Sequence, residues 1–194
     1  MPALIIAFLA VAIHLSPTMT NALQWTRGGE HFSTLWTAHL THWSAGHLFW
    51  DALMLAVFGL IAARSYGLRL LTTFLLTAPL ITIGVAYFSP EITSYRGLSG
   101  LDTLLFTYVC LKILCDAKQT QSMRIASVLM MLGLTGKTAY ETMTHSALFA
   151  GDLGPGVVTV PVAHLIGGLL GAALAVGSLT RKPLKGAAAS ALPN

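Results

Sequence analysis

The sequence predicts an all-α membrane protein, a single bundle of six transmembrane helices. Hydrophobic residues make up 55% of its 194 residues and charged residues only 9%, and the mean hydropathy is +0.72. A soluble domain of this size would lack the polar surface needed to cover itself. The apolar residues also gather in segments close to the roughly 20 residues that cross a bilayer, and unpaired backbone groups are too costly in lipid for anything but helices there.

The first predicted helix is the apolar run from Ala3 to Leu15, which ends near Pro17. No Lys or Arg precedes it, and Ser16-Pro17-Thr18 is a poor cleavage site, so a transmembrane helix is favoured over a secretory signal. Residues 18–43 form a mixed segment with three tryptophans, a residue type typical of the headgroup level. We expect this segment to lie at the membrane interface.

Five further apolar segments follow, at residues 45–63, 68–88, 99–115, 123–140 and 157–179. Gly133, Gly136 and Lys137 weaken the end of the fifth helix, so five helices is the alternative count. Residues 1–180 are therefore one transmembrane domain, and residues 181–194 are a basic, disordered cytoplasmic tail. Cys110 and Cys115 fall near opposite faces of one helix and are not expected to pair.

Charge placement predicts the orientation. Eleven Lys and Arg against seven Asp and Glu give a net charge of +4, but the basic residues lie between apolar runs, which indicates membrane orientation and no nucleic-acid partner. The second loop, the fourth loop and the tail are basic: Arg64 and Arg69, Lys118 and Arg124, and Arg181, Lys182 and Lys185. The other loops mix both signs: Arg27 with Glu30, Arg96 with Glu91, and Lys137 with Glu141 and Asp152. The positive-inside rule then puts both termini in the cytoplasm.

The motif Gly97-Leu98-Ser99-Gly100 opens the fourth helix. A hydroxyl between glycines suits either a packed turn or a nucleophile that must approach its substrate closely, and the motif alone does not choose. The predicted topology starts the second, fourth and sixth helices on the outer side, so His47, Ser99 and His164 lie at a similar depth. His164 is seven residues into its helix, roughly 10 Å deep. An intramembrane histidine is a functional candidate, with a hydrogen-bonded packing role as the alternative.

Small residues around His164 predict a close helix contact. Ala163, Gly167 and Gly171 are spaced by four, a pattern that lets two membrane helices approach each other. If this stripe packs on the fourth helix, Ser99 meets His164, and a serine beside a histidine is a nucleophile beside a general base.

Over roughly residues 36–177, the sequence resembles the rhomboid intramembrane serine proteases. The matching pieces are His42 and His47, Gly97-Leu98-Ser99-Gly100, and Ala163-His164-x-x-Gly167-x-x-x-Gly171. The local sequences Thr41-His42-Trp43-Ser44 and residues 95–102 are most similar to those of the rhombosortase branch. That branch is associated with removing a glycine-glycine-containing C-terminal membrane anchor from secreted proteins.

The resemblance implies a rhomboid-like bundle and a serine–histidine dyad without cofactor or metal. Ser99 would attack the scissile carbonyl and His164 would act as the base, while the Ser99 N–H and His47 would stabilise the oxyanion, supported by Gly97 and Leu98. It further implies a multi-pass protein of the bacterial inner membrane, in contact with lipid and opening to the extracytoplasmic side. Its substrates would be transmembrane or C-terminally anchored proteins.

Three positions depart from the family pattern. Asp51 stands where rhomboids usually have an asparagine that donates to the oxyanion, and we expect it to pair with His47, four residues earlier on the same helix face. Thr103 replaces a tyrosine that stacks on the catalytic histidine, so what holds His164 is open. Trp36-Thr37 replaces Trp-Arg, which leaves the anchoring of the interfacial segment open.

The other polar residues receive weaker roles. Asp102 either orients a polar group in the site or pairs locally with Arg96, and His42 is expected to shape a water-filled mouth. The remaining histidines are assigned no role: His14, His31, His39 and His145.

Two other functions are retained as alternatives, a general rhomboid protease and an inactive rhomboid-like protein that binds membrane helices. A haem or metal site is disfavoured, because His42 and His47 are about 140° apart around a helix.

Overall fold

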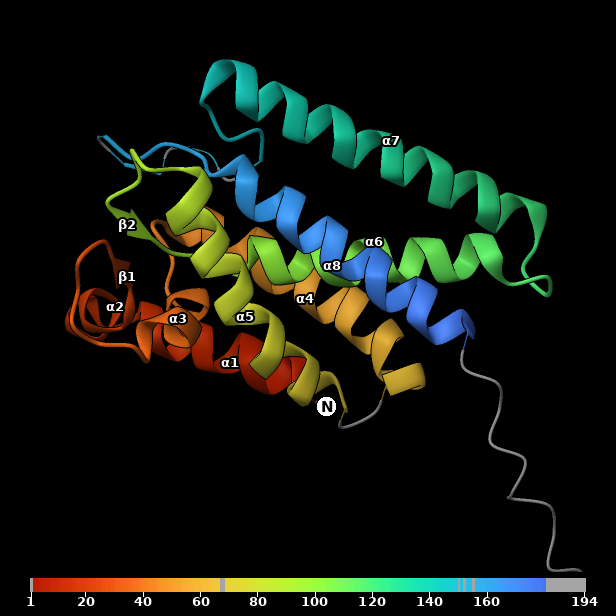
Figure 1. The fold of residues 1–194 in the computed structure, drawn as a ribbon, viewed down its shortest axis with the longest axis horizontal. Helices are drawn as coiled ribbons and strands as arrows, with labels where there is room; N and C mark the ends of the chain where they lie inside the picture. Colours follow the sequence, from red (N-terminus) through yellow and green to blue (C-terminus); the bar gives the residue numbers. More distant parts are fainter. Residues whose placement is uncertain (1, 67–68, 150, 152, 155, 181–194) are drawn as a thin grey trace, which may run out of the picture.

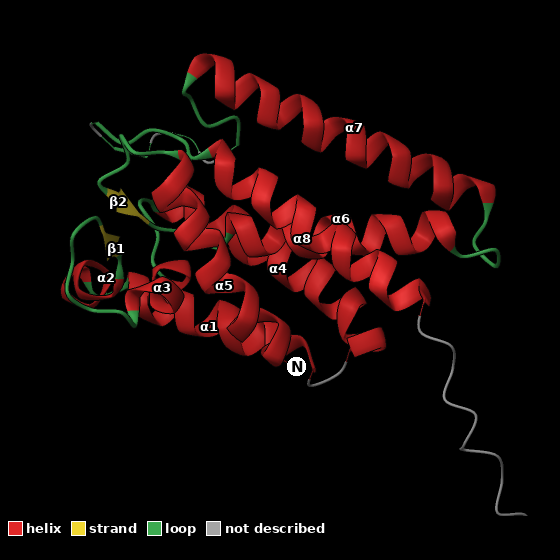
Figure 2. Ribbon diagram, in the orientation of Figure 1, coloured by secondary structure: helices red, strands yellow, loops and turns green. Residues whose placement is uncertain are grey.

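The computed structural model describes residues 2–66, 69–149, 151, 153–154 and 156–180, which form a helical bundle (Figures 1 and 2). Its main helices are α1 (Pro2–His14), α4 (Ala45–Tyr66), α5 (Arg69–Phe88), α6 (Ser99–Cys115), α7 (Gln121–Thr144) and α8 (Pro161–Thr180). Short elements connect α1 to α4: α2 (Pro17–Leu23), β1 (Trp25–Thr26), α3 (Thr34–Thr37) and the 3₁₀ helix η1 (Ala38–Leu40). The predicted tail, residues 181–194, lies outside the described residues.

Among the helices of the described residues, three are long and apolar enough to cross a membrane: α4, α5 and α8. A fourth crossing is possible if α1 and α2, which bend by 116° at their junction, count together. The bend has a local cause, because Pro17 lacks an N–H and begins α2 under a cap from the Ser16 side chain. These helices indicate a multi-pass membrane protein, while six crossings and cytoplasmic termini remain predictions.

The fifth predicted helix is longer than expected. The apolar segment predicted a helix over residues 123–140 with an end weakened by Gly133, Gly136 and Lys137, but α7 continues to Thr144, after which His145 takes a left-handed conformation with φ 55°. Each internal glycine costs a helix only about 1 kcal/mol, which the rest of a 24-residue helix can offset. Lys137 and Glu141, counted as loop residues in the sequence analysis, therefore lie within α7.

Helix α6 is the centre of the bundle. Its residues from Gly100 to Cys110 are all buried, and it contacts α4, α5, α7 and α8. The closest contact is with α8, where a Cβ on Gly167 would overlap the Gly100 carbonyl oxygen and one on Gly171 would overlap that of Leu104. The predicted small-residue contact between these helices is confirmed, and it fixes the start of α6 against the start of α8.

The segment between α1 and α4 is anchored on α5. Arg27 donates three hydrogen bonds, each 3.0 Å long, to the carbonyls of Ala86 in the last turn of α5 and of Ser89 and Ile92 just beyond it. Carbonyls in the last turn of a helix lack helical partners. Strand β1 also pairs antiparallel with β2 (Ser94–Tyr95), which leads into α6. Arg27 thus supplies an anchor in a chain that lacks the Trp-Arg pair of the family.

A second anchor uses a proline inside α5. Pro79 has no N–H, so the Leu75 carbonyl four residues earlier lacks its helical partner. The indole Nε1 of Trp36 donates to this carbonyl at 2.7 Å. The carbonyl that Pro79 leaves without a helical partner is thereby hydrogen-bonded by a side chain from the segment before α4.

His39 belongs to the same anchoring region. Its ring is buried, with Nε2 2.9 Å from the Ala78 carbonyl oxygen and Nδ1 3.2 Å from that of Gly97. Burial lowers its pKa from 6.5 to about 4. His39, to which the sequence assigned no role, thus links η1 to both α5 and the turn before α6.

Candidate active site

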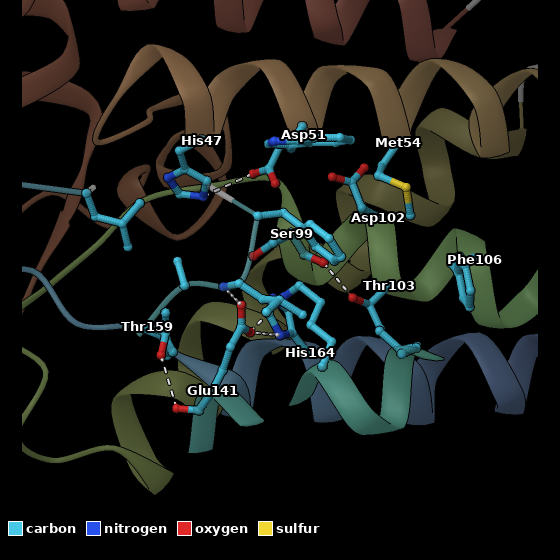
Figure 3. A pocket seen from close by; sticks show the side chains of 18 of the residues that line it. His47, Asp51, Met54, Ser99, Asp102, Thr103, Phe106, Glu141, Thr159 and His164 are labelled. Atoms are coloured by element: carbon cyan, nitrogen blue, oxygen red, sulfur yellow. Dashed lines mark hydrogen bonds and ion pairs between the residues drawn. The ribbon is translucent and has the colours of Figure 1, made fainter. Parts of the chain in front are cut away.

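A cavity of about 410 Å³ lies between α4, α6, α7 and α8 (Figure 3). Its polar lining includes five residues singled out from the sequence, namely His47, Asp51, Ser99, Asp102 and His164, and one that was not, Glu141. Trp43, Trp50, Met54 and Phe106 contribute apolar walls. The structure therefore brings together, from three helices, the residues that the sequence analysis placed at one depth.

The three central residues all lie in the first turn of a helix. Ser99 begins α6, His47 is two residues after the start of α4, and His164 is three residues after the start of α8. The predicted start of this helix near Val157 is wrong: α8 begins at Pro161, so His164 is three residues, or about 4.5 Å, from the helix start and not seven residues, or roughly 10 Å. First-turn N–H groups lack helical acceptors and carry partial positive charge, so this end of the bundle favours a developing anion.

The turn before Ser99 is shaped by Gly97. Its φ of +124° is one that side-chain-bearing residues rarely adopt, and a Cβ there would lie 2.9 Å from the His47 ring. The next amide, Leu98 N–H, donates to Asp51 Oδ2 at 2.9 Å. Ser99 itself is half-buried, and neither its Oγ nor its N–H has a hydrogen-bond partner among the described residues. Both groups are thus available to a bound molecule.

Asp51 is the acceptor for three donors. Its Oδ2 lies 2.9 Å from Leu98 N, 3.1 Å from His42 Nε2 and 3.3 Å from His47 Nε2. A carboxylate only accepts, so each ring presents an Nε2–H toward it. The predicted His47–Asp51 pair is present. His42 is 1% exposed and binds Asp51, so the expectation that it shapes a water-filled mouth is wrong.

His164 faces a carboxylate that sequence reasoning missed. Its Nδ1 lies 3.4 Å from Glu141 Oε2, within ion-pair distance, although no hydrogen bond forms in this geometry. Glu141 is 2% exposed, and its carboxylate also binds Lys137 Nζ at 2.7 Å and Leu148 N at 3.1 Å. The spacing of Lys137 and Glu141 by four, read as a helical pair, could have extended α7 by one turn and brought Glu141 into the site.

Two other expectations are answered by hydrogen bonds. Thr103 donates to the Ser99 carbonyl at 2.8 Å, so it does not take the place of the tyrosine that would stack on His164. Arg96 bonds Gln24 and Asn21 and lies 4.1 Å over the Trp43 ring. The prediction that Asp102 pairs locally with Arg96 is therefore wrong. Asp102 is 3% exposed, and its carboxylate has no hydrogen-bond partner within the described part of the chain.

Within the ranges that the structure describes, no three His, Cys, Asp or Glu side chains are arranged to hold a metal ion. The chemistry that this site offers is that of a hydroxyl, an imidazole and free amides beside an apolar cavity. Such groups suit acyl transfer through a serine.

Comparison with known proteins agrees with this chemistry. No curated protein matches the chain, but the family model described as Rhomboid domain matches residues 29–181. The matched range runs from the interfacial segment to the end of α8 and contains every residue of the cavity named above. The chain belongs to the rhomboid family of intramembrane proteases.

Proposed function

We propose that the protein is a serine endopeptidase that cleaves membrane-anchored proteins, with Ser99 as nucleophile and His164 as general base. The observation that carries the proposal is the close crossing of α6 and α8, whose first turns contribute both residues to one cavity. Ser99 Oγ and His164 both line the cavity but are not hydrogen-bonded to each other. Such contacts are often loose until substrate binds.

The proposed reaction follows the serine-protease pattern. Ser99 Oγ attacks the scissile carbonyl while His164 takes its proton, and the tetrahedral intermediate expels the amine, which receives that proton. Water then hydrolyses the acyl-enzyme with His164 acting again as base. The free Ser99 N–H at the start of α6, together with His47, is suited to stabilise the oxyanion.

Asp51 has a supporting role in this proposal. Its Oδ2 already accepts from Leu98 N–H and from the rings of His42 and His47. The Asp51 carboxylate can compensate a positive charge on the His47 ring, and Nδ1 of that ring, which has no hydrogen-bond partner among the described residues, can then donate to the oxyanion. If Asp51→Ala abolishes activity while Asp51→Asn retains all of it, the charge of Asp51 is not what matters.

For the substrate we propose a C-terminal anchor that contains glycine-glycine, as in the rhombosortase branch, cut near the outer face of a bacterial inner membrane. The local sequences of residues 41–44 and 95–102 support this substrate class, and the distribution of charged residues among the loops supports the orientation. The mostly apolar cavity wall also suits a hydrophobic peptide segment.

The test is coexpression of the wild type or Ser99→Ala with a secreted protein bearing a glycine-glycine anchor, and separately with a transmembrane substrate lacking it. Loss of the anchor only with the wild type supports the proposal. Cleavage of only the second substrate favours the alternative of a general rhomboid protease. Failure of the inserted wild type to cut either substrate favours an inactive helix-binding protein, and equal cleavage by Ser99→Ala refutes the nucleophile.

A further inference from the structure

The imidazole of His164 has one nitrogen directed toward α7. Its Nδ1 is buried and has no hydrogen-bond partner among the described residues, and the carboxylate within ion-pair distance is Glu141, with Oε2 at 3.4 Å. A buried N–H beside a carboxylate at this separation is one small adjustment from a hydrogen bond. The interaction of Nδ1 with Glu141 leaves Nε2 for the proton of Ser99.

We propose that Glu141 is a positioning residue for His164, a third member of the site supplied by α7. This inference rests on the proposed protease function. When His164 takes the Ser99 proton on Nε2, it becomes an imidazolium in a site largely shielded from water. The Nδ1–H then donates to Glu141 Oε2, which stabilises the cation and fixes the ring.

The surroundings of Glu141 prepare it for this role. Oε2 is also bound by Lys137 Nζ at 2.7 Å, which compensates the buried charge in the resting state. Oε1 accepts from Leu148 N at 3.1 Å, so both carboxylate oxygens are held. A carboxylate with locked oxygens can orient an imidazole without reorganising during the reaction. Thr103, bonded to the Ser99 carbonyl, is unable to do so.

The experiment compares Glu141→Gln with the wild type, using purified protein and the substrate that the wild type cuts best. Glutamine keeps an oxygen for the Leu148 amide but removes the charge. We expect kcat to fall about 10- to 100-fold with KM within twofold, less than the roughly 10⁴-fold loss at a triad aspartate, because Oε2 is shared with Lys137. The unfolding temperature should change little. Glu141→Asp, which keeps the charge on a shorter side chain, should retain a higher kcat than Glu141→Gln.

A purely structural role for Glu141 predicts the opposite order, because aspartate is too short to hold the Leu148 amide and glutamine is not. Wild-type kcat in Glu141→Gln overturns the proposal, and so does a loss that is matched by a lower unfolding temperature. These outcomes are separate from failure of the protease function itself. If the proposed protease function is wrong, the wild type cuts no membrane substrate and Ser99 is not labelled by a fluorophosphonate.

Discussion

Gly167→Ala tests whether the α6–α8 crossing sets the geometry of the site. The added methyl group would overlap the carbonyl oxygen of Gly100, the residue next to Ser99. Because this neighbour is backbone, it cannot rotate away. Non-bonded atoms keep about 3.5 Å apart, so the helices must separate by on the order of 1 Å.

Two effects follow from that separation. Overpacking of a tight contact costs about 1–3 kcal/mol of unfolding free energy. Displacing a base from its nucleophile by about 1 Å costs on the order of 10²-fold in rate. We therefore expect Gly167→Ala to lower both the unfolding temperature and kcat, measured by thermal unfolding in detergent and by cleavage of a transmembrane substrate.

Gly168→Ala is the matched control on the same helix. Its methyl group would lie 3.7 Å from Thr107 Oγ1 and 3.8 Å from Thr103 Cγ2, which are ordinary contacts. Alanine also favours a helix over glycine by about 1 kcal/mol. This variant should keep its activity and its stability. Equal behaviour of the two variants would refute the reasoning.

The anchoring residues give the remaining predictions. Between pH 6.5 and 4 an unfolded His39 binds a proton that the folded state excludes. The free energy of unfolding therefore decreases as pH falls through this window, by about 2 kcal/mol at pH 5. Thermal unfolding measured at pH 7.5 and at pH 5 should show a smaller decrease in His39→Gln than in the wild type. An equal decrease in both proteins would contradict this prediction. Trp36→Phe leaves the Leu75 carbonyl unpaired and should cost about 1–3 kcal/mol in the same assay, whereas an unchanged unfolding temperature would mean that lipid-side water replaces the indole. Arg27→Gln should be at least as destabilising, because charged hydrogen bonds are worth about 1.5–3 kcal/mol, and should increase protease cleavage within residues 18–43; unchanged cleavage would argue against this anchor.

The sequence predicted the bounds of α6 correctly. Ser99 begins a 17-residue segment that is rich in apolar residues although it contains Asp102 and Lys112, and hydropathy and length sufficed to locate the helix at residues 99–115. The spacing of Gly167 and Gly171 likewise predicted a contact that depends only on the absence of side chains. Features set by local composition and helical periodicity could therefore be predicted from the sequence.

Features set by long-range partners were not. Glu141 was taken for a loop residue, because its burial against His164 depends on where α7 ends and on the segment that follows. His42 was expected to face water, since nothing nearby in sequence reveals that Asp51 would accept its Nε2–H. The start of α8 at Pro161 was missed because the apolar run begins four residues earlier than the helix does.

The anchoring of the interfacial segment on α5 has a consequence for the order of assembly. The donors Arg27 and Trp36 emerge from the ribosome well before their acceptors, which lie 39 to 65 residues later in the chain. The segment between α1 and α4 therefore lacks these anchors on α5 until α5 has been inserted. A nascent chain arrested before residue 88 should leave this segment open to added protease, and synthesis through α5 should close it.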